Sequence, residues 1–265
     1  MDAIRSPQNP KIKLARSLHQ RKGRRKHHAF LVEGLRHVAA ALEAEAPLRY
    51  LLWAPERLTS PFGQELVRQA QARGIPVDAV TARVLDTIST KEHTQGLVAV
   101  AQPRTTGLAD LDPAHTAWVV AAVAPQNPGN VGTLLRTMDA VGANALVLLD
   151  GGVDPYHPAA VRASMGALFW LPVVQTSWSA FRQWQQAHGY RLYGTSAHQG
   201  TAYRAATYRW PLALLLGNER HGLTAAQRAA CDEMLTLPMH GHGTSLNLAV
   251  AAGVLLYAQE AQRHA

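Results

Sequence analysis

Three polar segments in the second half of the sequence each lie at the end of an apolar run. They are "QNPGNVGTLLRT" (126–137), "LLLGNERHGL" (214–223) and "LPMHGHGTSLNLAVAAG" (237–253). Ligands of open parallel sheets bind outside the carboxyl ends of the strands, so we expect these segments to meet in one site. Their amide, hydroxyl, carboxylate and guanidinium groups could bind and align a polar substrate. The candidate residues are Asn130, Arg136, Glu219, Ser245 and Asn247.

The first segment does not match the phosphate-binding loops that its glycines suggest. It has no lysine, so it lacks the G-x-x-x-x-G-K-[ST] pattern of nucleotide-binding P-loops. The G-x-G-x-x-G spacing of dinucleotide-binding folds is absent as well. Simpler roles stay open, because Asn130, Thr224 or Ser245 could cap a helix and Glu219 could be a solvated loop acid.

Other reactive side chains give weaker signals. His240 and His242 flank Gly241, and His221 lies in the second segment, but cysteine or carboxylate partners at ligand spacing are missing. We therefore expect no metal. The single cysteine, Cys231, excludes an intrachain disulfide and is expected to pack as a small hydrophobe. The absence of G-x-S-x-G disfavours an α/β-hydrolase.

Hydrophobic periodicity predicts an α/β fold in two parts. The first part is a small α/β domain, with strands expected at 30–34, 48–54, 75–80 and 96–102 and helices at 38–42, 60–73 and 83–88. Residues 101–116 then lose periodicity and contain two prolines, which is typical of a linker.

The second part is predicted to be a buried parallel sheet, because its strands are short and apolar on both faces. Strands are expected at 117–124, 145–150, 171–176, 190–196 and 212–217, and helices at 158–168, 178–188, 223–230 and 246–263. A further helix follows the first polar segment. Its apolar stripe leaves Arg136 outside, free to face a ligand. The stripe consists of Val131, Leu134, Leu135, Met138 and Val141.

Positive charge is concentrated at the N-terminus. Residues 1–30 carry nine Lys or Arg and one acid, a net 9 − 1 = +8, which equals the net charge of the whole chain. A solvated tail is one interpretation, and an element that contacts nucleic-acid phosphates is the other. Apolar residues interleaved with the charges favour an element anchored on a folded domain. The candidate contacts are Lys11, Lys13, Arg21, Lys22, Arg24, Arg25 and Lys26.

The composition is that of a globular protein, with 47% hydrophobic and 17% charged residues. No apolar run approaches the ~18 residues of a membrane-spanning helix. The polar start lacks the apolar core of a signal peptide, so we expect a cytoplasmic location.

The polar segments also carry a family resemblance. "NPGNVGTLLRTMDAVGA", "LLLGNERHGL" and "LPMHGHGTSLNLAVAAGVLLYA" resemble motifs one, two and three of the SpoU/TrmH-type RNA ribose 2′-O-methyltransferases of the SPOUT superfamily. "SPQNPKIKLARSL", "FLVEG" and "TQGLVAVA" are similar to the accessory RNA-substrate-binding domain of these enzymes. We accordingly expect an RNA-substrate-binding domain at 1–103, a linker at 104–116 and a SPOUT methyltransferase domain at 117–265.

The resemblance implies a homodimer, a deep trefoil knot and S-adenosylmethionine as cofactor. It also implies methyl transfer to a ribose 2′-hydroxyl, with 23S-type ribosomal RNA as the first candidate substrate and transfer RNA as the second. By motif position, the catalytic residues would be the five candidates named first. The cofactor would be bound by Thr195, Leu216, Gly217, Leu237, Met239 and Leu246.

Two rival functions stay open at this stage. One is a non-enzymatic RNA-binding or assembly protein on the same fold, and the other is a knotted methyltransferase that modifies a base. The role of Arg136 is open too. A guanidinium is a poor general base because its pKa lies above ~12, so a clamp on phosphate that stabilises developing alkoxide is favoured over proton abstraction.

Overall fold

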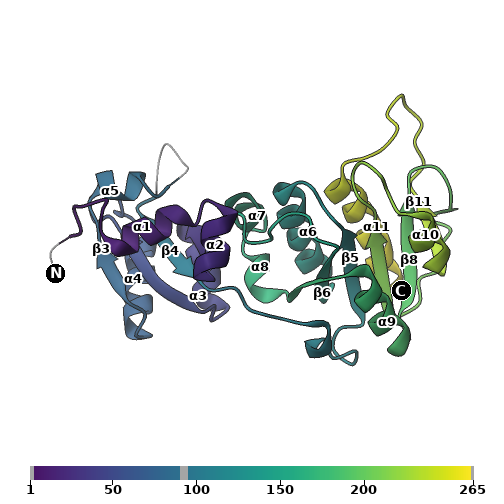
Figure 1. Cartoon of the computed structure of the whole chain (residues 1–265), viewed down its shortest axis with the longest axis horizontal. Helices are drawn as coiled ribbons and strands as arrows, with labels where there is room; N and C mark the ends of the chain where they lie inside the picture. Colours follow the sequence, from purple (N-terminus) through teal and green to yellow (C-terminus); the bar gives the residue numbers. More distant parts are fainter. Residues whose placement is uncertain (1–2, 90–94, 264–265) are drawn as a thin grey trace. The chain divides into compact units, whose positions relative to one another are not determined.

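A computed structural model describes residues 3–89 and 95–263. Thr94, the first residue of "TQGLVAVA", lies outside this part. The chain forms two compact units, and the first consists of Met1–Arg104 together with Tyr156–Phe169. The second consists of Thr105–Pro155 and Trp170–Ala265 (Figure 1). Within the described residues, no helix combines the length and hydropathy needed to cross a membrane.

The first unit contains a mixed sheet in the order β1-β4-β2-β3. Strand β4 (Leu97–Ala101) pairs antiparallel with both β1 (Phe30–Glu33) and β2 (Leu48–Trp53). Strand β3 (Val77–Ala79) adds parallel to β2. Three helices complete the expected α/β arrangement, α3 (Leu35–Glu43), α4 (Pro61–Ala72) and α5 (Ala82–Asp86).

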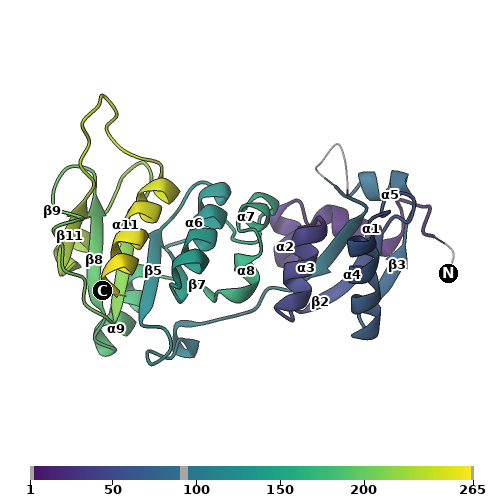
Figure 2. The same cartoon turned by 180° about the vertical axis from the view of Figure 1, so that it is seen from behind.

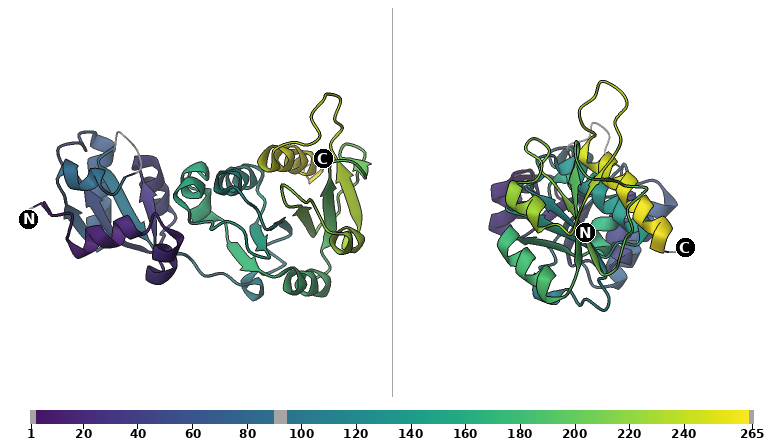
Figure 3. Two further views of the ribbon diagram at one scale, coloured as in Figure 1. Left: turned by 45° about the horizontal axis from the view of Figure 1, so that its top comes forward. Right: turned by 90° about the vertical axis from the view of Figure 1, so that its right-hand side faces the viewer.

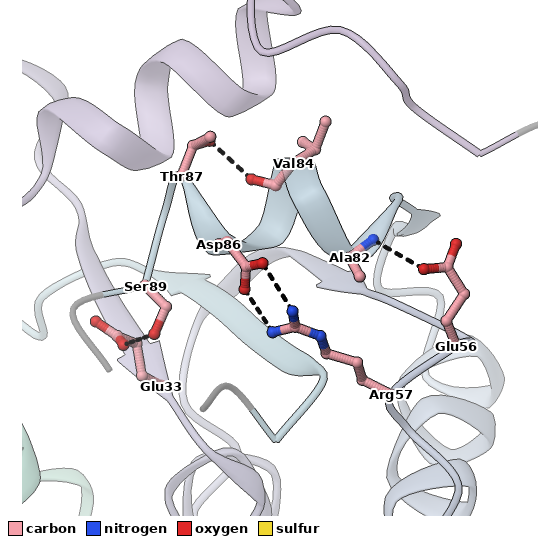
Figure 4. A network of polar contacts seen from close by, with 8 residues as sticks. All are labelled: Glu33, Glu56, Arg57, Ala82, Val84, Asp86, Thr87 and Ser89. Atoms are coloured by element: carbon pink, nitrogen blue, oxygen red, sulfur yellow. Dashed lines mark hydrogen bonds and ion pairs between the residues drawn. The ribbon is translucent and has the colours of Figure 1, made fainter. Parts of the chain in front are cut away.

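Polar contacts attach α5 to the segment that follows β2 and attach the residues after α5 to β1 (Figure 4). The Arg57 guanidinium donates two hydrogen bonds, of 2.5 and 2.7 Å, to the Asp86 carboxylate at the end of α5. The Ser89 hydroxyl donates to Glu33 Oε2 on β1 over 2.9 Å. These contacts fix the helix that follows β3.

The segment Tyr156–Phe169 packs inside the first unit, although the sequence places it between the first two polar motifs. Tyr156 and Phe169 lie 4.7 and 6.3 Å from the Phe30 ring, measured between centroids. The sequence predicts one helix here, at 158–168, but the structure has α7 (Pro158–Ala163) and α8 (Ala167–Trp170). Positive φ angles at Met165 and Gly166 break the helix between them.

The basic N-terminus is folded, not a loose tail. It forms two helices, α1 (Pro10–Ser17) and α2 (Arg21–His27), which were not expected as helices from the sequence. Ile12 and Leu18 are fully buried, which confirms that apolar side chains anchor this element.

Arg24 is a structural residue of this region. Its side chain is 5% exposed, and its guanidinium donates to the carbonyl oxygens of Leu18 (2.8 Å) and His19 (3.0 Å). These carbonyls follow the end of α1, where backbone acceptors lack helical partners. The sequence placed Arg24 among the phosphate contacts, and its burial removes it from any exposed surface.

The second unit contains a parallel sheet in the order β7-β6-β5-β10-β8-β11-β9. The strands are β5 (Trp118–Val123), β6 (Ala145–Leu149), β7 (Val173–Thr176), β8 (Arg191–Ser196), β9 (Thr201–Ala202), β10 (Leu212–Leu216) and β11 (Glu233–Thr236). Every residue of β5, β6 and β10 is buried, as the prediction of a buried parallel sheet requires.

Helices cover this sheet and set the orientation of Arg136. Helix α6 (Pro128–Val141) follows β5, and Figure 2 shows it beside the C-terminal helix α11 (Leu248–Arg263). The predicted apolar stripe of α6 is buried, while Arg136 is exposed. The remaining elements are α9 (Trp178–Ala187), α10 (Ala225–Ala230) and the short 3-10 turn Leu108–Asp110.

Two short strands, β9 and β11, were not expected from the sequence. Their residues are largely half-buried or exposed, so they lack the continuous apolar run of the central strands. The long loop between β11 and α11 stands away from the sheet in both views of Figure 3. The trefoil knot that the resemblance implies for this C-terminal part stays a prediction.

Arg24 is buried and its neighbour Arg25 is exposed, so we expect substitution of Arg24 alone to destabilise the fold. Arg24→Ala should lower the free energy of unfolding by about 2 kcal/mol, because hydrogen bonds from a charged donor are lost and buried carbonyls lose partners. Arg25 is exposed, so Arg25→Ala should change the free energy of unfolding by less than ~0.5 kcal/mol. Thermal unfolding of the two variants checks this, and equal midpoints would contradict the structural role.

Candidate functional site

A pocket of about 780 Å³ lies at the carboxyl ends of four parallel strands of the second unit. Its lining includes the residues that directly follow β8, β10 and β11, the turn after β5 from Gln126 onward, and the start of α11. The strands β6 and β7 lie on one side of β5, and β10, β8 and β11 lie on the other. The pocket therefore occupies the switch point at which such sheets bind ligands.

Three of the predicted catalytic residues are joined by hydrogen bonds in this pocket. Asn247 Nδ2 donates to Asn130 Oδ1 over 3.0 Å, and Asn130 Nδ2 donates to Glu219 Oε1 over 3.4 Å. The Glu219 carboxylate also accepts the backbone N–H of Gln126, with its two oxygens 3.1 and 3.0 Å away. The three polar motifs thus meet, as expected.

The helix starts explain how these side chains are placed. Asn127 caps α6, because its Oδ1 accepts from the Gly129 N–H over 2.7 Å. Asn130, 9% exposed, lies one turn later and points toward Glu219 instead of capping. Asn247 serves both purposes, since its Oδ1 accepts from the Ala249 N–H (2.9 Å) while its amide nitrogen binds Asn130. Of the alternative caps considered, Thr224 alone is one, at α10.

The turns after β5 and β10 are held together by contacts in both directions. Asn218 Nδ2 donates to the Ala124 carbonyl over 2.9 Å, while the Gln126 N–H donates to Glu219. Ala124 has a φ of 39°, a left-handed conformation that a non-glycine residue adopts at a cost. The Asn218 bond therefore stabilises a strained turn beside the pocket.

Gly217 is required by the protein chain itself. A Cβ at this position would lie 2.7 Å from the carbonyl carbon of Gly222, because the turn folds back on the end of β10. Gly222 has a φ of 63° and pairs with Asn218 through two backbone hydrogen bonds. Glycine at position 217 is therefore needed for the turn to pack against the end of β10, in addition to any space that it leaves for a ligand.

All six residues expected to bind the cofactor line the pocket, and some of their groups fix its shape. Thr195 Oγ1 donates to the Leu215 carbonyl over 3.1 Å and accepts from the Gly217 N–H over 3.4 Å. The lining combines apolar and polar residues, a mixture typical of sites for small cofactors. The volume also lies within the range of such sites, ~300–1,000 Å³. The apolar lining comes from Leu216, Leu235, Leu237, Met239, Leu246 and Leu255.

Two predicted catalytic residues lie apart from the hydrogen-bonded set. Ser245 lines the pocket and is exposed, in the loop that leads to α11. Arg136 is exposed on α6 and is not among the residues that line the pocket. The sequence correctly placed Arg136 outside the buried stripe of its helix, but the single chain does not bring it to this pocket.

The sequence analysis missed polar residues at the pocket mouth, namely Asn218, Arg220 and His221. They lie inside the second motif on either side of Glu219, so their position next to a candidate was the available signal. Cys231 is partly buried, and burial raises the pKa of its thiol to about 11, which fits a packing role and not a nucleophile. Across 3–89 and 95–263, no three His, Cys, Asp or Glu side chains are grouped as for a metal ion.

In the first unit, the predicted phosphate contacts fall into two groups. Lys13, Arg21, Lys22, Arg25 and Lys26 are exposed on α1 and α2, and Arg16 joins them. Lys11 is half-buried, and its Nζ lies 2.5 Å from Asp78 Oδ2 and 5.6 Å from the centroid of the Tyr50 ring. Lys11, like Arg24, therefore has partners within the protein.

Comparison with known proteins assigns both parts of the chain to known families. Residues 117–257 match the SpoU rRNA Methylase family, and residues 9–99 match the MRM3-like substrate binding domain. The chain is 34% identical to 23S rRNA (guanosine(2553)-2′-O)-methyltransferase RlmP of Bacillus subtilis strain 168, over 97% of this chain and 98% of that protein.

Solved structures agree with the sequence relatives. An AdoMet-bound rRNA methyltransferase from Sinorhizobium meliloti superposes with a TM-score of 0.89 at 32% identity, over 99% of this chain and 98% of that one. The SpoU methyltransferase AviRb from Streptomyces viridochromogenes, in complex with AdoMet, gives 0.86 at 31% identity, over 97% and 98% of the two chains. The α/β fold with its parallel sheet is therefore that of the SPOUT methyltransferases, and this chain belongs to the SpoU family of RNA 2′-O-methyltransferases.

Proposed function

We propose that this chain transfers the methyl group of S-adenosylmethionine to the 2′-hydroxyl of a ribose in 23S-type ribosomal RNA, in the cytoplasm, with transfer RNA as the second candidate substrate. The observation that carries the proposal is the hydrogen-bonded set Asn247–Asn130–Glu219 inside the pocket at the strand ends. The MRM3-like domain and the RlmP relative, named as a 23S rRNA enzyme, support ribosomal RNA.

The pocket residues account for binding and alignment. When bound, S-adenosylmethionine would supply an electrophilic methyl group on a sulfonium; the C–O bond would form as the S–CH3 bond breaks, S-adenosylhomocysteine would leave, and the proton of the 2′-hydroxyl would pass to solvent. The leucines with the backbone groups after β8, β10 and β11 would hold the cofactor. Both oxygens of Glu219 face the Gln126 N–H, and Oε1 also accepts from Asn130. We assign Glu219 to holding the site in shape, because these contacts occupy it as an acceptor. The exposed Ser245 hydroxyl is free to bind the ribose, which leaves alignment of the attacking oxygen to neutral groups.

Arg136 fits this reaction in a homodimer. Helix α11 exposes an apolar stripe in which Val250, Val254 and Tyr257 are 53%, 37% and 56% exposed. It packs beside α6 near Thr137, one residue from Arg136. An exposed apolar stripe marks an interaction surface, and two-fold symmetry is the commonest way to cover one. We propose that this face forms the dimer, and that Arg136 of the partner subunit completes each pocket as a clamp that stabilises the developing alkoxide.

Labelling of RNA tests the reaction. Unmodified 23S ribosomal RNA and transfer RNA are each incubated with the protein and methyl-labelled S-adenosylmethionine and then digested with alkali. Because a 2′-O-methyl group blocks cleavage of its own linkage, we expect label in alkali-resistant dinucleotides from 23S ribosomal RNA. Label in mononucleotides would mean base methylation instead. No label with either RNA, together with no binding of the cofactor, would favour the non-enzymatic RNA-binding function.

Arg136→Ala should lower kcat by at least about 100-fold, the loss typical of removing one stabilising donor, with the cofactor Kd nearly unchanged. Radiometric turnover and isothermal titration measure the two quantities. Equal loss of both would contradict the clamp role.

Mixed dimers test the position of Arg136. Co-expressed Arg136→Ala and Asn130→Ala chains, each inactive as homodimers, should regain activity, because one pocket then has an intact lining and a partner's arginine. Mixed dimers without activity would place Arg136 in the pocket of its own chain.

We also propose that the exposed bases of α1 and α2 bind the RNA backbone. Replacing Arg21, Lys22, Arg25 and Lys26 with Gln should reduce the slope of log K against log salt by about 3, since each phosphate contact contributes roughly 0.7–0.9. Deletion of residues 1–30 is a poorer test, because it would remove core residues such as Ile12.

The matched control is Arg68→Gln with Arg83→Gln, two exposed bases elsewhere in the same unit. Filter binding at several salt concentrations compares the variants. An unchanged slope in the fourfold variant would refute the role of α1 and α2.

A further inference from the structure

The mouth of the pocket, by which we mean its exposed lining in the turn after β10, carries basic side chains that neither the motif assignments nor the comparisons explain. Arg220 and His221 follow Glu219 in the turn after β10, and both are exposed and line the pocket. Arg228 lines it as well, with its guanidinium donating to the Leu223 carbonyl over 2.6 Å. Outside residues 1–30 the chain has equal numbers of bases and acids. The charge at this mouth is therefore a local feature.

The turn that displays Arg220 and His221 is held in one conformation. Asn218 Oδ1 accepts from the N–H of Arg220 (2.9 Å) and of His221 (3.2 Å), and Asn218 pairs with Gly222 through two backbone bonds. Its amide nitrogen reaches across to the Ala124 carbonyl. One asparagine thus fixes the turn internally and attaches it to the end of β5.

Glu219, the neighbour of Arg220 in the sequence, does not neutralise it. The Glu219 carboxylate is directed at the Gln126 N–H and at Asn130, on the β5 side of the pocket. Among the described residues, the ion pairs of the structure do not include Arg220. The charged side chains that line the pocket are Arg220, Arg228 and Glu219, a net 2 − 1 = +1 with histidine counted as neutral. An anionic ligand would therefore meet an uncompensated guanidinium at the mouth.

We propose that Arg220, assisted by His221, binds an RNA phosphodiester adjacent to the target ribose, and that Asn218 is the positioning residue for this subsite. A guanidinium binds phosphate through two parallel N–H donors, and a histidine ring adds a further N–H. This inference rests on the proposed function and deepens it. It gives the mouth of the pocket a role in holding the backbone while the groups inside act on the hydroxyl.

The test compares Arg220→Gln with Arg209→Gln. Arg209 is also exposed, but it precedes β10 and so lies toward the opposite edge of the sheet. With unmodified 23S ribosomal RNA transcript, Arg220→Gln should raise KM about tenfold, as expected for loss of a charge-assisted contact. The kcat and the S-adenosylmethionine Kd should stay within twofold of wild type. Arg209→Gln should resemble wild type in all three.

The salt dependence of RNA binding gives a readout that does not need turnover. Filter binding of the same transcript should show a slope of log K against log salt that is smaller by about 0.7–0.9 in Arg220→Gln, the contribution of one phosphate. An unchanged slope and KM would overturn the proposal. A weakened S-adenosylmethionine Kd with unchanged RNA binding would also overturn it, because Arg220 would then bind the cofactor's carboxylate.

A double-mutant cycle tests Asn218 as a positioning residue. Asn218→Ala alone should raise KM for the transcript several-fold, and it should also weaken the S-adenosylmethionine Kd because the bond to the Ala124 carbonyl is lost. In the Arg220→Gln background its effect on KM should be small, because that part passes through Arg220. Independent, multiplying effects would mean that Asn218 acts only on folding. Failure of the proposed function looks different. Wild-type protein would then bind the transcript without methylating it, and the salt slopes would still decide the Arg220 subsite.

Discussion

The turns that follow β5 and β10 hold each other through reciprocal hydrogen bonds, and the pocket depends on them. Neighbouring parallel strands end at the same edge of a sheet, but their loops are free to diverge unless something joins them. Here the Asn218 amide binds the Ala124 carbonyl, and Glu219 binds the Gln126 N–H. Because Ala124 adopts a positive φ, the chain stores strain at this point and needs these partners to keep it.

Further contacts extend from this pair of turns. Glu219 orients Asn130, Asn130 receives the Asn247 amide, and Asn247 caps the helix whose exposed side carries the apolar stripe. A substitution of Glu219 would thus disturb the start of α11, on the far side of the pocket. Only Asn130 of this set is buried, while Glu219 and Asn247 are exposed, so Asn130 is the member that most needs both of its partners.

The sequence predicted the central sheet well because its strands are continuous apolar runs bounded by glycine-rich turns. It also indicated Asn130 and Glu219, since polar residues after two such strands must meet at one edge, and it indicated Asn247 through the glycine-punctuated segment that carries it, although the strand before that segment was not predicted. The charge pattern could not separate Arg24 from Arg25, because burial of a guanidinium depends on carbonyls at the end of a helix that is not apparent from periodicity. Strand β11 was not predicted, because it lies next to the edge of the sheet and only one of its four residues is buried. The sequence did not indicate Arg220, because Glu219 beside it was the residue of this motif that was selected as a candidate.

The path of the chain between the two units has a consequence for biosynthesis. The first unit is not one continuous stretch, because Tyr156–Phe169 belongs to it and is reached only after β5 and β6 have been made. The first unit therefore cannot complete its fold until β5 and β6 of the second sheet have also emerged from the ribosome. Domains made of one uninterrupted segment can fold as soon as they leave the exit tunnel, N-terminal first. In this protein the Phe30 ring can pack against Tyr156 and Phe169 only after these two residues have been synthesised. Folding of the first unit is therefore coupled to synthesis of the second.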